Sequence, residues 1–225
     1  NSKFLVATGI STSVITMIFW SFGFLRMGTT GLVSQSLGKG DYREIVLSVL
    51  RNLSLALLIS LIIIILQTPI LNLIDYFFYN SSETQGLIQK YISIRVWSAP
   101  AELSIYVLSG MFIGLQKTKI SSLLLSMFSI LNIIFSYYFV VNLELNIYGV
   151  ALGTVISSYL TAVTFLIFSF YYIRNKFNII PRYRKIFIAK KLFKLLNINF
   201  DIFIRTLLLT FSFLWFTYQS SKIGE

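Results

Sequence analysis

Long, uninterrupted apolar stretches separated by short polar connectors dominate the chain. A helix that spans a bilayer needs about 20 apolar residues at a rise of about 1.5 Å each. The apolar residues run continuously and do not alternate with polar ones at period two, so the pattern predicts spanning helices rather than barrel strands. The six predicted spans are Phe4–Leu25, which can continue to about Val33, Ile45–Leu66, Tyr91–Leu115, Ile120–Val141, Tyr148–Ile173 and Phe200–Ser220.

The composition indicates that lipid is the main solvent of this chain. Of its 225 residues, 56% are hydrophobic and 12% are charged, whereas soluble domains carry about 25% charged residues. The chain has no Cys and no His, which excludes disulfides, thiolate metal sites and His-based catalysis. We therefore expect an all-α membrane protein that is not an enzyme and has neither a metal site nor a cofactor.

The polar connectors fall alternately on two sides of the membrane, and their basic residues are unevenly divided. Residues 34–44, 116–119 and 174–199 lie on one side and carry twelve basic residues, against three on the other side. Because Lys and Arg concentrate in cytoplasmic loops, the first side is predicted to be cytoplasmic and residue 1 to lie outside. The net charge of +11 then reflects membrane topology, and we expect no nucleic-acid partner.

Both ends of the chain suggest a piece of a longer protein. The chain starts on the predicted outer side with Asn1 instead of Met, and it stops just after the last span. One preceding helix would put the start in the cytoplasm, as in many bacterial transporters. We expect a multi-pass fragment of the inner (plasma) membrane that lacks the remainder of its own chain.

The segment 174–199 is the strongest candidate boundary, because it is the longest polar stretch and holds eight of the basic residues together with Pro181. It divides the chain into a transmembrane lobe, residues 1–173, and the start of a second lobe, residues 200–225. Within it, Tyr183–Leu196 has apolar residues at roughly helical spacing opposite Lys and Arg. This pattern fits an amphipathic helix on the anionic cytoplasmic leaflet, or a solvated connector.

Glu102 is the most informative charge, because a charged residue at the bilayer centre costs about 2.5–3.5 kcal/mol. It follows Pro100, which kinks the helix and frees carbonyl groups. A proton or cation site fits this pattern, and so does a Glu bonded to Ser, Tyr or Arg of a neighbouring helix. Arg95 lies two turns away, about 10 Å along the axis, and is expected to extend toward the outer interface instead.

Polar uncharged residues and glycines mark the predicted helix contacts. Asn132 and Ser136 lie one turn apart, and with Thr154 they can face a water-filled cavity or bond to a partner helix. The G-x-x-x-G patterns at Gly110–Gly114 and Gly149–Gly153 predict close helix approach within the protein.

Several strings resemble the MATE (multidrug and toxic compound extrusion) family, in particular its DinF-like branch. They are FGFLRMGTTGLVSQSLGKGD at Phe22–Asp41, YISIRVWSAPAELSIYVLSGMFIGLQKTK at Tyr91–Lys119, LNIIFSYYFVVNLELNIYGVALGTVIS at Leu131–Ser157 and, more weakly, DIFIRTLLLTFSFLWFTYQSSKIG at Asp201–Gly224. The resemblance implies a protein of twelve helices in two lobes, of which this chain supplies helices two to seven. That is one incomplete lobe and the first helix of the other.

The resemblance also implies a function and a site. Family members export organic, usually cationic, compounds in exchange for H⁺ or Na⁺ by rocking one lobe against the other. The Asn and Thr of the family's first-lobe cation site match Asn132 and Thr154. Ser136, which does not titrate, stands where the family has an Asp, and a further Asp lies outside the chain. Our hypothesis is that Glu102 supplies the missing carboxylate.

Two alternatives stay open at this stage. One is a lipid-linked oligosaccharide flippase of the same superfamily, which should have a markedly cationic central cavity. The other is a membrane protein fragment that does not transport, since one lobe cannot enclose a cavity between two. The strings R-M-G-T-T-G and I-R-V-W-S-A-P favour the MATE interpretation.

Overall fold

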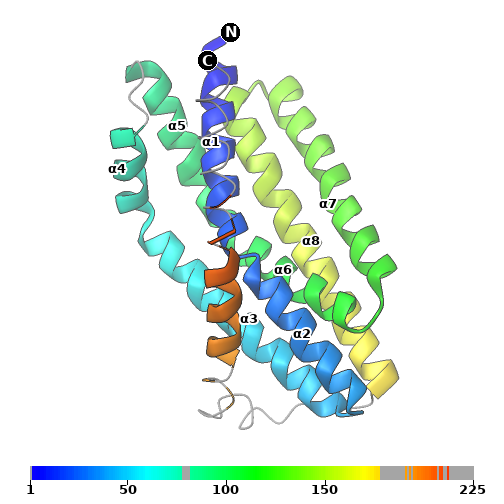
Figure 1. The fold of residues 1–225 in the computed structure, drawn as a ribbon. Coiled ribbons are helices and arrows are strands. Elements are labelled where there is room, and N and C mark those ends of the chain that lie inside the picture. Colours follow the sequence, from blue (N-terminus) through cyan, green and yellow to red (C-terminus); the bar gives the residue numbers. More distant parts are fainter. Residues whose placement is uncertain are drawn as a thin grey trace, which may run out of the picture.

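In a computed structural model of the protein, residues 2–77, 82–177, 191, 193, 195–206, 208, 209 and 212 are described, and all of its secondary structure in this part is helical. The helices are α1 (Ser2–Ser21), α2 (Phe24–Gly38), α3 (Tyr42–Ile65), α4 (Gln67–Phe77), α5 (Ser82–Arg95), the 3-10 turn η1 (Val96–Ser98), α6 (Ala99–Gly114), α7 (Thr118–Tyr137), the π-helical turn η2 (Tyr138–Asn142) and α8 (Asn146–Phe177) (Figure 1).

The described helices join into five stretches that are long and apolar enough to cross a membrane, and these confirm the first five predicted spans. They are Phe4–Gly38, Tyr42–Ile65, Thr84–Gly114, Thr118–Asn142 and Asn146–Phe177. Much of the predicted sixth span lies outside the described residues, although residues 200–206 are helical. The fifth span continues to Phe177, four residues into the predicted linker 174–199. Most of the predicted amphipathic segment Tyr183–Leu196 lies outside the described residues.

The first span is longer than the apolar pattern predicts, and it ends in a tight connection. A turn at Phe22 and Gly23 separates α1 from α2, which continues to Gly38. Gly40 has a φ of 68°, a backbone conformation that glycine adopts at little cost. Asp41 then caps α3 by accepting the Glu44 backbone N–H at 3.0 Å, so α3 begins at once.

The stretch 67–90, between the second and third predicted spans, is mostly helical, which the apolar pattern does not predict. Gln67–Phe77 forms α4, with Pro69 in its first turn, where a proline's missing N–H costs nothing. Ser82–Arg95 forms α5. Ile88 of α5 is 1% exposed, because it packs on protein. A helix covered by protein needs only one apolar face, which is why a search for continuous apolar runs misses it.

The third span is the centre of the bundle, and α7 lies at its edge. In its most apolar window 72% of the residues of Thr84–Gly114 are buried, against 6% for Thr118–Asn142. Helix α6 packs against α2, α3 and α8, whereas α7 packs mainly against α8, and Figure 1 shows the α7–α8 pair along one side of the molecule. Polar groups on the third span are therefore surrounded by protein.

The predicted close contacts of Gly110–Gly114 are confirmed against α2. A Cβ atom on Gly110 would lie 2.5 Å from the Arg26 carbonyl oxygen, and one on Gly114 would lie 2.8 Å from that of Thr30. The Thr30 hydroxyl donates to the Gly110 carbonyl at 3.2 Å. Small residues on α6 thus let the two backbones meet and share hydrogen bonds.

Gly149–Gly153 makes the corresponding contact between α8 and the end of α7 with the η2 turn that follows it. A Cβ atom on Gly149 would lie 2.9 Å from the backbone carbon of Phe139, and one on Gly153 would lie 2.7 Å from the Ser136 nitrogen. The second predicted glycine contact is therefore also present. It holds the faces of α7 and α8 that carry the candidate polar residues close together.

Candidate cation site at the centre of the bundle

Asn132 and Thr154 form a direct link between α7 and α8. The Asn132 side-chain amide donates to the Thr154 hydroxyl oxygen at 2.8 Å, and that hydroxyl donates in turn to the Val150 carbonyl at 2.9 Å. Thr154 is 9% exposed. The two residues that the resemblance assigns to a cation site therefore lie together in the structure.

Ser136 lies one turn along α7 from Asn132 and faces Gly153 of α8. Its hydroxyl oxygen is buried and has no hydrogen-bond partner in the part of the chain that the structure describes, and a Cβ atom on Gly153 would lie 2.7 Å from it. A buried hydroxyl without a partner costs free energy. The structure places Ser136 beside the Asn132–Thr154 link but does not join it to that link.

Glu102 is held by three donors on three different elements. One carboxylate oxygen, Oε1, accepts from Arg95 of α5 at 2.6 Å, from Ser98 of η1 at 3.1 Å and from Ser158 of α8 at 3.2 Å. The break in the helix before Pro100, which the sequence predicts, is the η1 turn. The carboxylate is thus paired with a basic side chain and two hydroxyl groups in this arrangement.

The expectation that Arg95 extends toward the outer interface is wrong. Its side chain turns toward Glu102 and lies with its guanidinium carbon 5.6 Å from the centre of the Phe19 ring. Arg95 is only 9% exposed, so an opposite charge stabilises it more than a distant interface would. Glu102 leans toward the start of its helix, as side chains in helices do, and this closes the gap that the axial distance suggests.

Ser158 connects the Asn132–Thr154 link to the Arg95–Glu102 pair. It lies one turn after Thr154 on α8, and its hydroxyl is within 2.8 Å of the Thr154 carbonyl oxygen as well as within reach of Glu102. Since a hydroxyl has one proton, the two acceptors compete for it. Asn132, Thr154, Ser158, Glu102 and Arg95 therefore form one hydrogen-bonded series, which we call the central polar series.

Neither Ser158 nor Ser98 is singled out in the sequence analysis. The available signal was the four-residue spacing of Thr154 and Ser158, which puts both on one face of α8. No local signal points from Ser158 to Glu102, because 56 residues separate them.

A bundle of spanning helices with an ion pair and a series of polar side chains at its centre defines a multi-pass membrane protein with a polar site between its helices. The sequence model of the MatE family matches residues 1–138, and the chain belongs to this family. The family consists of membrane transporters rather than enzymes.

The curated relatives include the DNA damage-inducible protein F of Escherichia coli K12. It is 30% identical over 222 residues, which cover 99% of this chain and 48% of that protein. The multidrug export protein MepA of Staphylococcus aureus is 24% identical over 175 residues, covering 78% of this chain and 38% of MepA. The first relative confirms the DinF-like branch. The chain spans about half the length of this relative and less of the second.

Solved structures agree on the fold. A MATE protein in complex with MaD3S superposes with a TM-score of 0.82 at 18% identity, over 95% of this chain and 48% of that one. A MATE transporter described as outward-facing gives 0.79 at 19% identity, over 93% and 46%. The helices of this chain therefore have the arrangement of about half of a MATE transporter.

Proposed function

We propose that this chain forms the first lobe, and the start of the second, of a secondary antiporter that exports organic cations or drugs in exchange for H⁺ or Na⁺. The observation that carries the proposal is the central polar series. It puts a carboxylate, an arginine and two hydroxyl groups, four residues apart on α8, in the middle of a bundle of the MATE fold. Charged groups at such a depth are costly and are generally retained for function. The name of the relative MepA, a multidrug export protein, supports the same class of substrate.

In this proposal, Glu102 is the group that couples the inward movement of the coupling ion to the export of the organic cation. When it is ionised, it neutralises Arg95 at 2.6 Å, and the site has no net charge. When a proton or a cation neutralises Glu102, the positive charge of Arg95 is uncompensated and disfavours an organic cation nearby. Binding of the coupling ion and of a cationic substrate then exclude each other, as an exchange mechanism requires.

The membrane topology completes the proposal. In the proposed topology, the turn between α2 and α3, the turn between α6 and α7, and the linker 174–199 lie on the cytoplasmic side of the plasma membrane, because basic residues concentrate in cytoplasmic connectors. The flippase alternative has no support in the described residues. Arg95 and Arg51, both buried there, are each paired with a glutamate, at 2.6 Å and 2.8 Å, so they do not form a cationic cavity.

Replacement of Glu102 by Gln tests the proposal. In a transporter of the relatives' full length that carries this sequence, Glu102→Gln should reduce efflux of a fluorescent organic cation driven by a pH gradient by tenfold or more, which is about 1.4 kcal/mol of lost coupling. Efflux is measured in everted membrane vesicles after the gradient is imposed.

Glu144→Gln is the matched control, because Glu144 is exposed in the turn before α8 and the substitution makes the same change of charge. It should leave efflux unchanged. If pH-driven efflux survives in the Glu102→Gln variant at the level of this control, the role of Glu102 is refuted.

A further inference from the structure

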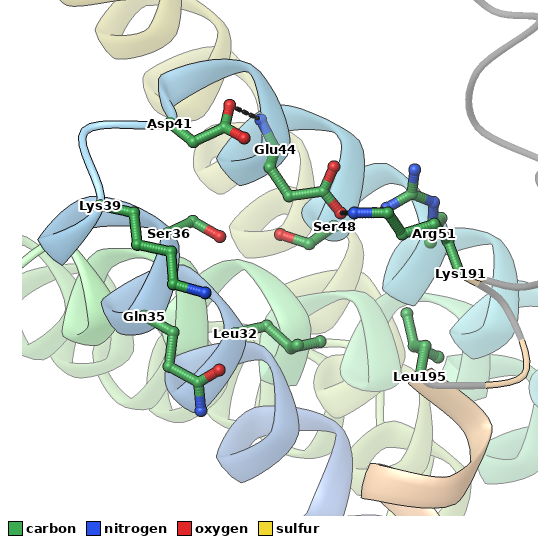
Figure 2. A pocket seen from close by; sticks show the side chains of 10 residues that line it. All are labelled: Leu32, Gln35, Ser36, Lys39, Asp41, Glu44, Ser48, Arg51, Lys191 and Leu195. Atoms are coloured by element: carbon green, nitrogen blue, oxygen red, sulfur yellow. Dashed lines mark hydrogen bonds and ion pairs between the residues drawn. The ribbon is translucent and has the colours of Figure 1, made fainter.

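A second polar site lies away from the central polar series, where the turn between α2 and α3 meets the segment that contains Lys191 (Figure 2). We propose that this pocket binds the phosphate group of an anionic phospholipid of the cytoplasmic leaflet. The choice of leaflet rests on the topology of the proposed function, whereas binding itself does not depend on transport.

The pocket has the size and the walls for such a group. Its volume is about 140 Å³, and a water molecule occupies about 30 Å³ in the liquid, so a phosphate group fits. Three basic side chains line it, Lys39, Arg51 and Lys191, together with two acidic ones, Asp41 and Glu44. Its walls therefore carry one more positive than negative charge.

Both carboxylates in the pocket are already engaged by the protein. Asp41 accepts the backbone N–H of Glu44 at 3.0 Å. The Oε1 atom of Glu44 is 2.8 Å from Arg51 and 3.2 Å from Lys191. The acidic groups thus help to fix the shape of the pocket, and the excess positive charge of Lys39, Arg51 and Lys191 over them attracts an added anion.

The donors left over suit phosphate oxygens. Ser36 is 8% exposed, and its hydroxyl has no hydrogen-bond partner among the described residues. Lys39 is exposed and forms no ion pair within the described part of the chain. Both line the pocket beside Gln35 (Figure 2). A phosphate has several acceptor oxygens, and charge-assisted hydrogen bonds to them are about twice as strong as neutral ones.

The apolar part of the wall favours a lipid over a free anion. Leu32 and Leu195 line the same pocket as the basic residues, and Leu195 is 3% exposed. An amphipathic molecule contacts both kinds of side chain at once. Basic pockets between spanning helices on the cytoplasmic side are recognised positions for anionic lipid head groups.

Native mass spectrometry of the purified protein tests the proposal, with phosphatidylglycerol, phosphatidylcholine and inorganic phosphate as separate probes. Phosphatidylglycerol should bind more tightly than the other two. Lys39→Gln should weaken its binding about fivefold, as expected for one basic residue at an anionic surface. Ser36→Ala, which keeps the net charge, should also weaken binding, by about threefold or more.

Lys119→Gln is the matched control, because Lys119 is an exposed lysine on the same predicted side that does not line the pocket. It should change binding by less than about twofold. Equal losses in the two lysine variants would show a diffuse surface effect and overturn the proposal, as would equally tight binding of phosphatidylcholine. Equally tight binding of inorganic phosphate would overturn the lipid assignment. The assay is independent of efflux, so its failure would leave the antiporter proposal standing.

Discussion

At the scale of single residues, the pair of Arg95 and Glu102 explains how a charge is kept inside this bundle. The two side chains are 11% and 15% exposed and 2.6 Å apart. Taking two charges out of water is costly, and only good geometry and further hydrogen bonds offset the cost. Ser98 and Ser158 supply those bonds to Glu102. The pair is thus stable while both charges are present and sensitive to the loss of either one.

A double-mutant cycle measures this dependence. Arg95→Gln leaves the Glu102 carboxylate without its counter-charge and should destabilise the protein by about 3–5 kcal/mol. Combining Arg95→Gln with Glu102→Gln removes both charges and should recover most of the loss. Thermal unfolding of the purified protein in detergent gives the comparison. A double variant no more stable than Arg95→Gln alone would contradict the description of the pair as mutually dependent.

At the scale of helices, the glycine faces of α6 and α8 set the distances on which the polar contacts depend. The close approach at Gly110 lets α2 donate two hydrogen bonds to α6. The Thr30 hydroxyl donates to the Gly110 carbonyl and, one turn further on, the Ser34 hydroxyl donates to the Gly114 carbonyl. A methyl group on Gly110 would meet the backbone of α2 rather than a flexible side chain, so the two helices would have to separate.

Gly110→Ala should therefore destabilise the protein by about 1–3 kcal/mol, the usual range for overpacking a close contact. Gly31→Ala on α2 is its control, because a Cβ atom there would have no atom within 4 Å. That substitution should be neutral or stabilising by up to about 1 kcal/mol, since Ala is the better helix former. Equal thermal stabilities of the two variants would show that the α2–α6 contact tolerates separation.

The sequence predicts elements better than it predicts partners. Five spans, the helix break before Pro100 and both glycine contacts follow from local patterns of apolar, small and cyclic residues. The partner of Arg95 and the link from Ser158 to Glu102 do not, because they depend on which helices become neighbours. Nor does the buried pair of Asn52 and Asn199, which are 3.1 Å apart and separated by 147 residues.

At the scale of the whole molecule, the described residues from Lys191 onward contact the helices α2 and α3. Asn199 donates to Asn52 of α3, and Phe203 packs edge-on against Phe24 of α2 at 5.6 Å between ring centres. Figure 1 shows this helical segment, in orange, near α2 and α3. Lys191 reaches Glu44 at 3.2 Å in the pocket proposed to bind lipid. The contacts of these residues therefore gather at the α2–α3 hairpin, and the lobe movement of the proposed transport mechanism would have to rearrange them.

Topology decides which aqueous compartment this hairpin and its lipid pocket face. The proposed arrangement puts position 185, in the basic linker, in the cytoplasm, and position 83, at the start of α5, outside. Reporter fusions at Glu83 and Lys185 should therefore give opposite signals, with alkaline phosphatase active only at position 83 and a fluorescent protein that folds only in the cytoplasm active only at position 185.

A fusion at Lys117, in the basic turn before α7, is the control and should behave like the one at Lys185. Signals from the same compartment at positions 83 and 185 would contradict the threading of the spans. Opposite signals with the sides exchanged would move the pocket to the outer leaflet, because the twelve basic residues would then not mark the cytoplasmic side.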